Sequence, residues 1–205
     1  MSMKLSFKGD KISFTRELSK LDQMALTFSE RLSAAGIRHI VLSGYVAILF
    51  GRNRTSEDID VICEHIPFTK FGRVWADIHR TFECIITTDA RSAYYEYLAN
   101  KTAIRFACKG EFIPNVELKF ASTEMHLEAL ARPLEVLVNG RHLPTAPLEQ
   151  QIAYKLFMAS EKDIEDARFL FKLFEQHLDK VKLAGYLKTL RVPLVRAKRY
   201  LGWCT

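Results

Sequence analysis

Stretches in which apolar residues recur at helical spacing alternate along the chain with short strand-like stretches, and this alternation predicts a mixed α/β protein. Apolar residues recur every three or four positions from about 15 to 35, which predicts an amphipathic helix that ends at Gly36. Residues 39–43 read as a short buried strand, and residues 58–63 alternate polar and apolar residues as a second strand. A short helix is expected between them, over 45–50.

The same alternation continues as far as about residue 145. The expected elements are, in order, a helix over 67–80, a strand over 82–87, a helix over 92–100, strands over 102–108 and 114–120, a helix over 123–132 and a hairpin over 134–144. Asn139-Gly140 stands between the two apolar runs of the hairpin, where a tight turn favours this pair. A mixed sheet with helices packed on it is the expected architecture.

From Pro147 onward the periodicity is helical throughout. Two helices are expected over 147–160 and 163–178, followed by two short basic helices that Pro193 separates. We therefore expect an α/β (α+β) fold in which residues 1–145 form the sheet core and residues 146–205 form a helical C-terminal region with a basic tail.

Charge is distributed unevenly between these two parts. The chain has 205 residues and a net charge of +6, from 30 basic and 24 acidic residues. Residues 180–205 hold seven Lys and Arg and no acid, so the preceding 179 residues, with 23 basic and 24 acidic, carry only −1. A basic tail with Tyr and Trp suggests RNA or another polyanion as a partner. A solubilising helix with lysines extended into solvent is the alternative.

Cysteine and hydropathy patterns exclude several classes of protein. The four cysteines form no CxxC pair, which excludes a zinc ribbon or a thioredoxin motif. They are Cys63, Cys84, Cys108 and Cys204. The longest apolar run, residues 45–50, is far shorter than the ~20 residues of a membrane helix, and the N-terminus resembles no secretory signal. We expect a cytoplasmic protein with reduced thiols and no membrane contact.

Candidate chemistry is concentrated between residues 43 and 60. Ser43-Gly44 stands where a strand enters a helix, a position at which glycine permits close approach and free N–H groups face an anion. Asp58 and Asp60 lie two apart on a predicted strand, so both side chains point to one face. Two carboxylates beside an anion cradle suit Mg²⁺ that bridges nucleotide phosphates.

Glu117 is the candidate for a third carboxylate. On its predicted strand Val116, Leu118 and Phe120 face one way, so Glu117 and Lys119 share the other face. A third carboxylate would complete a two-metal site and activate an attacking hydroxyl. The alternative is a Glu–Lys pair on an exposed strand.

This pattern resembles the polymerase-β-like nucleotidyltransferase superfamily, and it is most similar to the AbiEii-type and minimal nucleotidyltransferases of toxin–antitoxin systems. The resemblance covers about residues 38–175. The matching motifs are Ser43-Gly44, the turn Gly51-Arg52-Asn53-Arg54-Thr55, Asp58-Ile59-Asp60, Lys155 on a helix after the hairpin, and Lys162-Asp163-Ile164-Glu165-Asp166. One position departs from the family pattern, because Ser43 replaces the first glycine of the usual pair.

The resemblance implies a fold, a reaction and a set of roles. The fold would be a nucleotidyltransferase-type mixed sheet with flanking helices. A nucleoside triphosphate would lie over Ser43-Gly44, and Asp58 and Asp60 would hold two Mg²⁺ ions. Glu117 would bind the second ion and help to deprotonate an acceptor hydroxyl, which attacks the α-phosphorus in line and releases pyrophosphate.

Each of the other motif residues has two possible roles. Lys155 would contact the triphosphate in the family pattern, whereas the sequence alone favours a lysine extended into solvent. Asp163 and Asp166 would orient Lys155 or the nucleotide, or else complement a helix dipole. Arg54 and Thr55, like Arg52, would contact phosphate or acceptor, or serve as ordinary turn residues.

Several functions are compatible with these residues. The first is transfer of a nucleotide to RNA such as tRNA, or to a hydroxyl of a partner protein, in a toxin–antitoxin context. An aminoglycoside-type nucleotidyltransferase is another, although its cationic substrates would favour an acidic groove. A catalytically inactive binding module with the same fold is the alternative from a different class.

Overall fold

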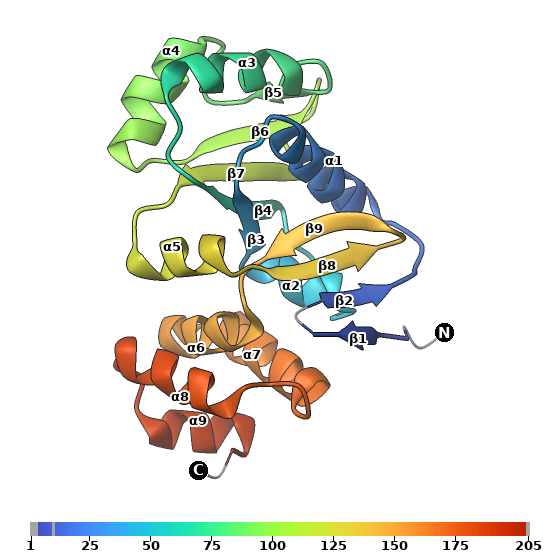
Figure 1. Ribbon diagram of the computed structural model, residues 1–205, viewed down its shortest axis with the longest axis vertical. Helices are drawn as coiled ribbons and strands as arrows, with labels where there is room; N and C mark the ends of the chain where they lie inside the picture. The colour runs from blue at the N-terminus through green and yellow to red at the C-terminus, as the bar shows by residue number, and fades with distance from the viewer. Residues whose placement is uncertain (1–3, 10, 204–205) are drawn as a thin grey trace.

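A computed structural model describes residues 4–9 and 11–203, and in this part of the chain the strands form one nine-stranded sheet (Figure 1). The strands are β1 (Ser6–Lys8), β2 (Lys11–Phe14), β3 (His39–Leu42), β4 (Asp58–Cys63), β5 (Phe82–Cys84), β6 (Ile104–Cys108), β7 (Asn115–Phe120), β8 (Leu134–Val138) and β9 (Arg141–Thr145). Their order in the sheet is β1-β2-β8-β9-β3-β4-β7-β6-β5. Antiparallel and parallel pairs alternate from β1 to β6, and the last pair, β6-β5, is antiparallel, so the sheet is mixed, as expected.

Helices cover this sheet and then continue as a separate layer at the C-terminus (Figure 1). The helical segments are α1 (Lys20–Ala34), α2 (Gly44–Leu49), α3 (Phe68–Ile78), α4 (Ala90–Ser92), the π-helical turn η1 (Ala93–Tyr97), the 3₁₀ turn η2 (Leu98–Asn100), α5 (Glu124–Ala131), α6 (Leu148–Met158), α7 (Glu161–Phe174), α8 (Lys180–Thr189) and α9 (Leu194–Leu201). Everything described after Thr145 is helix or connecting loop. Among the described residues, no helix has the length and apolar character required to cross a membrane.

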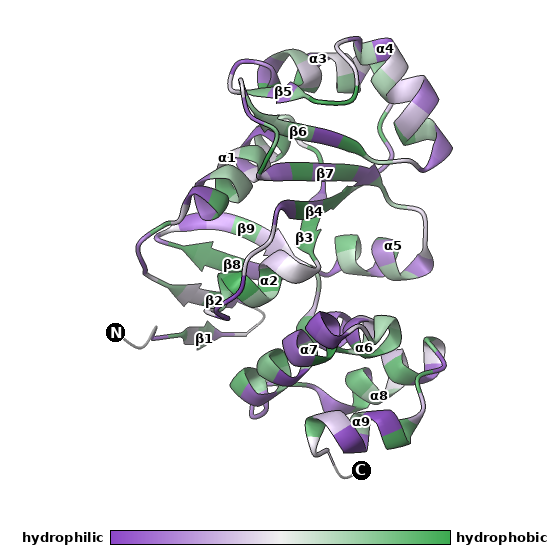
Figure 2. Ribbon diagram, turned by 180° about the vertical axis from the view of Figure 1, so that it is seen from behind, coloured by the Kyte–Doolittle hydropathy of each residue, from purple (hydrophilic) through white to green (hydrophobic). Residues whose placement is uncertain are grey.

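The two faces of the central strands pack against different groups of side chains. On β4, Ile59 and Val61 point into the main hydrophobic core, whereas Ile62 joins a smaller cluster with Ile40 of β3 and Leu130 of α5. Figure 2 shows the hydrophobic colour on these central strands. Because successive side chains of a strand alternate between faces, the residues that share a face with Ile62 lie outside the main core.

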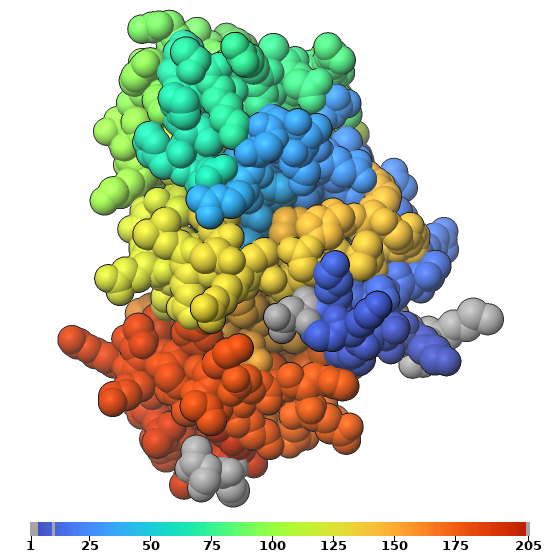
Figure 3. Space-filling model, viewed as in Figure 1, coloured from blue at the N-terminus to red at the C-terminus, as the bar shows by residue number. Residues whose placement is uncertain are grey.

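Aromatic packing joins the C-terminal helices to the sheet part. Phe174 of α7 makes an edge contact with Phe50, which follows α2, at a ring-centroid distance of 4.8 Å. The ring of Phe7 in β1 lies 6.1 Å from the Phe174 ring and stacks on the His177 ring at 3.7 Å. In Figure 3 the blue N-terminal strands and the yellow α5 segment both border the orange and red helices.

Several local predictions need correction. Strands β1 and β2 were not predicted, because three or four residues are too short to show a period. The strand expected over 82–87 ends at Cys84, and the helix expected over 92–100 is broken into α4, η1 and η2. Tyr94 lies in the π-helical turn at this break, where its buried ring packs among other aromatic rings and its hydroxyl donates to the Ile66 carbonyl. Cys63, Cys84 and Cys108 are free thiols, and Cys204 lies outside the described residues.

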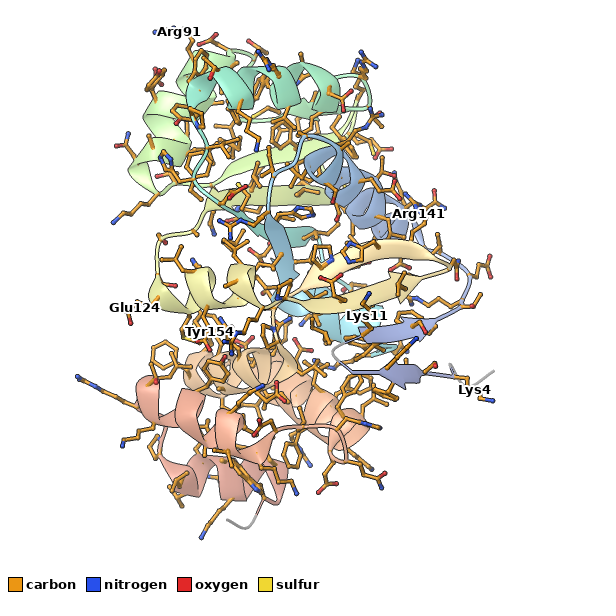
Figure 4. The ribbon with its side chains drawn as sticks, in the orientation of Figure 1. Lys4, Lys11, Arg91, Glu124, Arg141 and Tyr154 are labelled. Carbon is orange, nitrogen blue, oxygen red and sulfur yellow. The ribbon has the colours of Figure 1, made fainter. Side chains whose placement is uncertain are left out.

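Helix α1 begins at Lys20 rather than near residue 15, because a capping box fixes its start. The Ser19 side chain accepts from the Asp22 N–H, and the Asp22 carboxylate accepts from the Ser19 N–H. Asp22 is fully buried and also accepts from Arg16 at 2.5 Å and from the Tyr45 hydroxyl at 2.8 Å. The Asp22 carboxylate thus links α1 to α2, the helix that follows Ser43. A further contact to α1 comes from Arg141 of β9, which pairs with Glu30 at 2.7 Å (Figure 4).

Replacement of Asp22 by alanine is expected to destabilise the fold by about 3–5 kcal/mol, because it leaves the buried Tyr45 hydroxyl and the partly buried Arg16 guanidinium without their acceptor. The measurement is chemical denaturation followed by circular dichroism. Asp77→Ala is the matched control, because Asp77 pairs with Arg31 at 3.0 Å at a partly exposed site and such pairs contribute about 0–1 kcal/mol. Equal losses in the two variants would show that Asp22 has no special role.

Candidate active site

The register between β4 and β7 brings together the carboxylates that the sequence singled out. Asp60 lies directly opposite Glu117, and Asp58 lies opposite Asn115. Asp58 and Asp60 share one face of β4, as their spacing predicts, while Ile59 between them is in the main core. Leu42, the last residue of β3, is the partner of Asp60 on its other side. The carboxylates therefore lie directly beside the end of the strand that leads into Ser43.

The carboxylates are close enough to affect one another's protonation. Burial raises the pKa of Asp60, and the negative charges of Asp58 and Glu117 raise it further. A hydrogen bond from Ser43 and the charge of Lys119 act in the opposite direction. This balance is typical of an oxygen-rich site that a cation would stabilise.

Glu117 also has two cationic neighbours. Its carboxylate pairs with Lys119 at 2.6 Å and with Arg105 at 3.2 Å. These partners outweigh the effect of burial and lower the pKa of Glu117, so this carboxylate is ionised at neutral pH. The Glu–Lys pair expected as the alternative is therefore present, on the same face as Asp60.

The donor set fits Mg²⁺ in chemical type. All three groups are carboxylates, and hard oxygen ligands are the ones that Mg²⁺ prefers. Among the described residues, no three His, Cys, Asp or Glu side chains are already gathered in a metal-binding arrangement. Asp58 and Asp60 have no Lys or Arg within ion-pair distance among those residues, whereas Glu117 would have to exchange Lys119 and Arg105 for a metal.

Ser43 adopts a backbone conformation that usually belongs to glycine. Its φ is 71° and its ψ is −142°, a region that L-residues with a β-carbon rarely occupy. This explains physically why the family pattern has glycine at this position. The Ser43 N–H donates to the Oε1 of Gln151 at 2.9 Å, so α6 holds this turn from the opposite side.

Gly44 leaves room for a side chain of the protein itself. A β-carbon at Gly44 would lie 2.8 Å from the Nη2 of Arg54, closer than real contacts allow. We expected glycine here to admit a ligand phosphate, and the structure shows that the guanidinium of Arg54 occupies this side. Arg54 thus brings positive charge to the junction of β3 and α2.

Asp166 of α7 is fully buried and gathers three cations around it. Lys155 reaches its Oδ2 at 2.6 Å and Arg54 reaches the same oxygen at 2.8 Å, while Arg52 pairs with the Oδ1. The dipole interpretation of Asp166 is therefore insufficient, because the carboxylate is the common partner of three charged groups. Asp163 is the more peripheral acid, 3.5 Å from Lys155 and bonded to Ser160 at the start of α7.

Lys155 is 3% exposed, so it does not extend into solvent as the sequence alone favoured. Burial lowers its pKa to about 8, with the charges of Arg54 and Arg52 acting in the same direction and Asp163 opposing them. Its environment is therefore rich in positive charge. Thr55 is exposed, and its backbone carbonyl accepts from the Arg54 Nε at 3.2 Å.

The basic tail forms surface helices rather than part of the carboxylate cluster. Most cations of α8 and α9 are exposed, among them Lys188, Lys198 and Arg199. Arg196 is tied down, because it donates to the Leu156 carbonyl at the end of α6 at 2.9 Å.

Sequence reasoning missed Gln151, and it left the partners of Arg52 unidentified. A weak signal existed for Gln151, because it precedes Lys155 by four residues and so lies on the same side of α6. No sequence signal connects Arg52 with α7, where it donates to the Lys162 carbonyl at 3.1 Å and pairs with Glu165.

No protein-family model matches the chain, and no curated protein matches it. The structure is similar to the crystal structure of an antigenic nucleotidyltransferase-like protein from Paracoccidioides brasiliensis, with a TM-score of 0.52, 17% sequence identity and coverage of 87% of this chain and 91% of that one. Two other structures have lower TM-scores. They are JHP933 from Helicobacter pylori (0.47, 22% identity, 91% and 81% coverage) and the antibiotic-resistance factor ANT(2'')-Ia (0.49, 12% identity, 87% and 97% coverage). On the first of these likenesses, the chain has the mixed α/β fold of a nucleotidyltransferase-like protein.

Proposed function

We propose that the protein is a Mg²⁺-dependent nucleotidyltransferase that transfers a nucleoside monophosphate from a nucleoside triphosphate to a hydroxyl group. The observation that carries this proposal is the placement of two opposite charge clusters beside one turn. Asp60 is paired with Leu42, just before Ser43-Gly44, whereas Arg54 lies against Gly44 and shares Asp166 with Lys155. A metal-bound polyphosphate has the complementary charges for both.

Each side chain then has a role that its contacts support. Arg54 and Lys155 would neutralise the phosphate oxygens, and Asp166 holds both cations in place. Asp58 and Asp60 would hold the metal, with two Mg²⁺ ions when Glu117 contributes. The bound metal would neutralise the triphosphate and polarise its α-phosphorus. Glu117, ionised and beside Asp60, would accept the proton of the attacking hydroxyl, with pyrophosphate as the leaving group.

For the acceptor we propose RNA such as tRNA, with a hydroxyl of a partner protein as the alternative. The exposed cations of α8 and α9 support a polyanionic acceptor. The same charges argue against an aminoglycoside acceptor, which is itself cationic. The AbiEii-type affiliation, a toxin–antitoxin context and a cytoplasmic location belong to this proposal as well.

The first prediction concerns nucleotide binding. Thermal unfolding with ATP, GTP, CTP or UTP should show a Mg²⁺-dependent stabilisation, which reaches about 2.7 kcal/mol at one hundred times the dissociation constant. Asp60→Asn should abolish both this stabilisation and nucleotide transfer to tRNA or protein, because it removes a negative oxygen from the metal site. Asp77→Asn is the control. Asp77 belongs to a surface ion pair of α3, so this variant should keep the Mg²⁺-dependent stabilisation.

Two results would contradict this proposal. Stabilisation that persists in Asp60→Asn would exclude Asp60 as a metal ligand. Binding of nucleotide without transfer to any acceptor class would favour the inactive binding module, in which Lys119 and Arg105 keep Glu117 away from a metal.

A second prediction follows from the lowered pKa of Lys155. Only the ammonium form attracts phosphate, so nucleotide affinity should fall about tenfold as pH rises from 7 to 9, through the pKa of about 8. The triphosphate itself is fully ionised over most of this range, because phosphate groups lose their last proton near pH 6. Calorimetry in two buffers at pH 8.5 should show net proton uptake on binding, because the bound anion raises the pKa of Lys155.

Lys155→Arg should make the affinity independent of pH in this range, since a guanidinium stays charged. Its melting temperature, measured without ligand, serves as the control for folding. An unchanged decline in this variant would assign the titration to another group. A flat profile in the original protein, without proton uptake, would exclude a phosphate contact by Lys155.

A further inference from the structure

Among the residues that the structure describes, Gln151 makes the hydrogen bond that connects α6 to the turn at Ser43. Its Oε1 accepts from the Ser43 N–H at 2.9 Å, across 108 positions of sequence. The residue is 4% exposed. This amide therefore connects the C-terminal helices to the junction of β3 and α2.

Glutamine at this position has a cost that demands an explanation. The Nε2 of Gln151 is buried and has no hydrogen-bond partner among the described residues. An unpaired buried donor is unfavourable, and an apolar side chain of similar length would avoid it. The bond to Ser43 is the compensating interaction that the structure shows.

Ser43 needs such a partner because of its conformation. A serine at φ 71° is strained, and strained residues persist only where their surroundings fix them. Ser43 directly follows Leu42, the residue of β3 that is paired with Asp60. The backbone conformation of Ser43 thus sets how the chain leaves β3 beside this carboxylate.

We propose that Gln151 is a positioning residue of the active site, which holds Ser43 in the glycine-type conformation and so fixes the turn beside Asp60. Gln151 acts through Ser43 and does not itself touch the substrate. The part of this inference that concerns substrate binding rests on the proposed nucleotidyltransferase function. The part that concerns Ser43 does not depend on it.

The experiment is a double-mutant cycle with Gln151→Met and Ser43→Gly, in which glycine takes the positive φ without assistance. The readout is the dissociation constant of Mg²⁺ with inorganic tripolyphosphate, and of Mg²⁺ with ATP, by calorimetry. Gln151→Met should weaken both at least about tenfold in the original protein. In the Ser43→Gly background, the same change should alter them less than about twofold.

Gln150→Met is the matched control. Gln150 is the neighbouring buried glutamine of α6, 6% exposed, and it also has one amide atom unpaired. Its Nε2 donates to the carbonyl of Met125 in α5 at 3.0 Å, so its amide contacts α5 and not the turn at Ser43. This variant should leave both dissociation constants within about twofold. A loss that persists in Ser43→Gly/Gln151→Met would overturn the proposal, because Gln151 would then act on the ligand directly.

Amide hydrogen exchange at Ser43 tests the same inference without any ligand. Gln151→Met should accelerate exchange of the Ser43 N–H at least about tenfold, and Gln150→Met should leave it unchanged. Unchanged exchange in Gln151→Met would overturn the proposal even if nucleotides bind. If Gln151→Met accelerates exchange but the original protein binds no nucleotide, the proposed function is contradicted, whereas the positioning of Ser43 by Gln151 is supported.

Discussion

A carboxylate that has lost all contact with water must be neutralised by its neighbours, and Asp166 is such a group. Its three cationic partners come from two distant parts of the sequence. Arg52 and Arg54 belong to the turn before β4, and Lys155 belongs to α6. If one partner were displaced, the buried charge would remain, so the turn, α6 and α7 are held together by a strong constraint. The same turn leads directly into β4, whose first residues include Asp58 and Asp60.

The same constraint determines the electrostatics of the site. Three cations share Asp166, with Asp163 and Glu165 at the margin, so positive charge is concentrated in a small buried volume. Burial lowers the pKa of Lys155 to about 8, and the charges of Arg54 and Arg52 act in the same direction. Burial raises the pKa of Asp60, and the charges of Asp58 and Glu117 raise it further. The protein thus keeps like charges together in two clusters beside one turn, an arrangement that costs stability and that is typical of functional sites.

The sequence predicted those features that depend on local periodicity. The spacing of Asp58 and Asp60 placed both on one face of a strand, and Asn139-Gly140 predicted the hairpin, whose turn residues both have positive φ. The burial of Lys155 was not predictable in the same way, because a lysine at the edge of an apolar stripe suits either water or a buried partner. Its partner Asp166 lies on another helix, and only the packing of α6 on α7 decides between the two.

Ser43 shows how local and tertiary information combine. The sequence identified a serine in place of glycine, but no local pattern could show what would stabilise the resulting conformation. The answer lies 108 residues away, in the amide of Gln151. Because Gln151 and Lys155 are one turn apart on α6, one helix face supplies both the group that fixes Ser43 and a cation of the Asp166 cluster. The same helix therefore contacts both the turn beside Asp60 and the cation cluster at Asp166. Any shift of α6 against the sheet would change both contacts together.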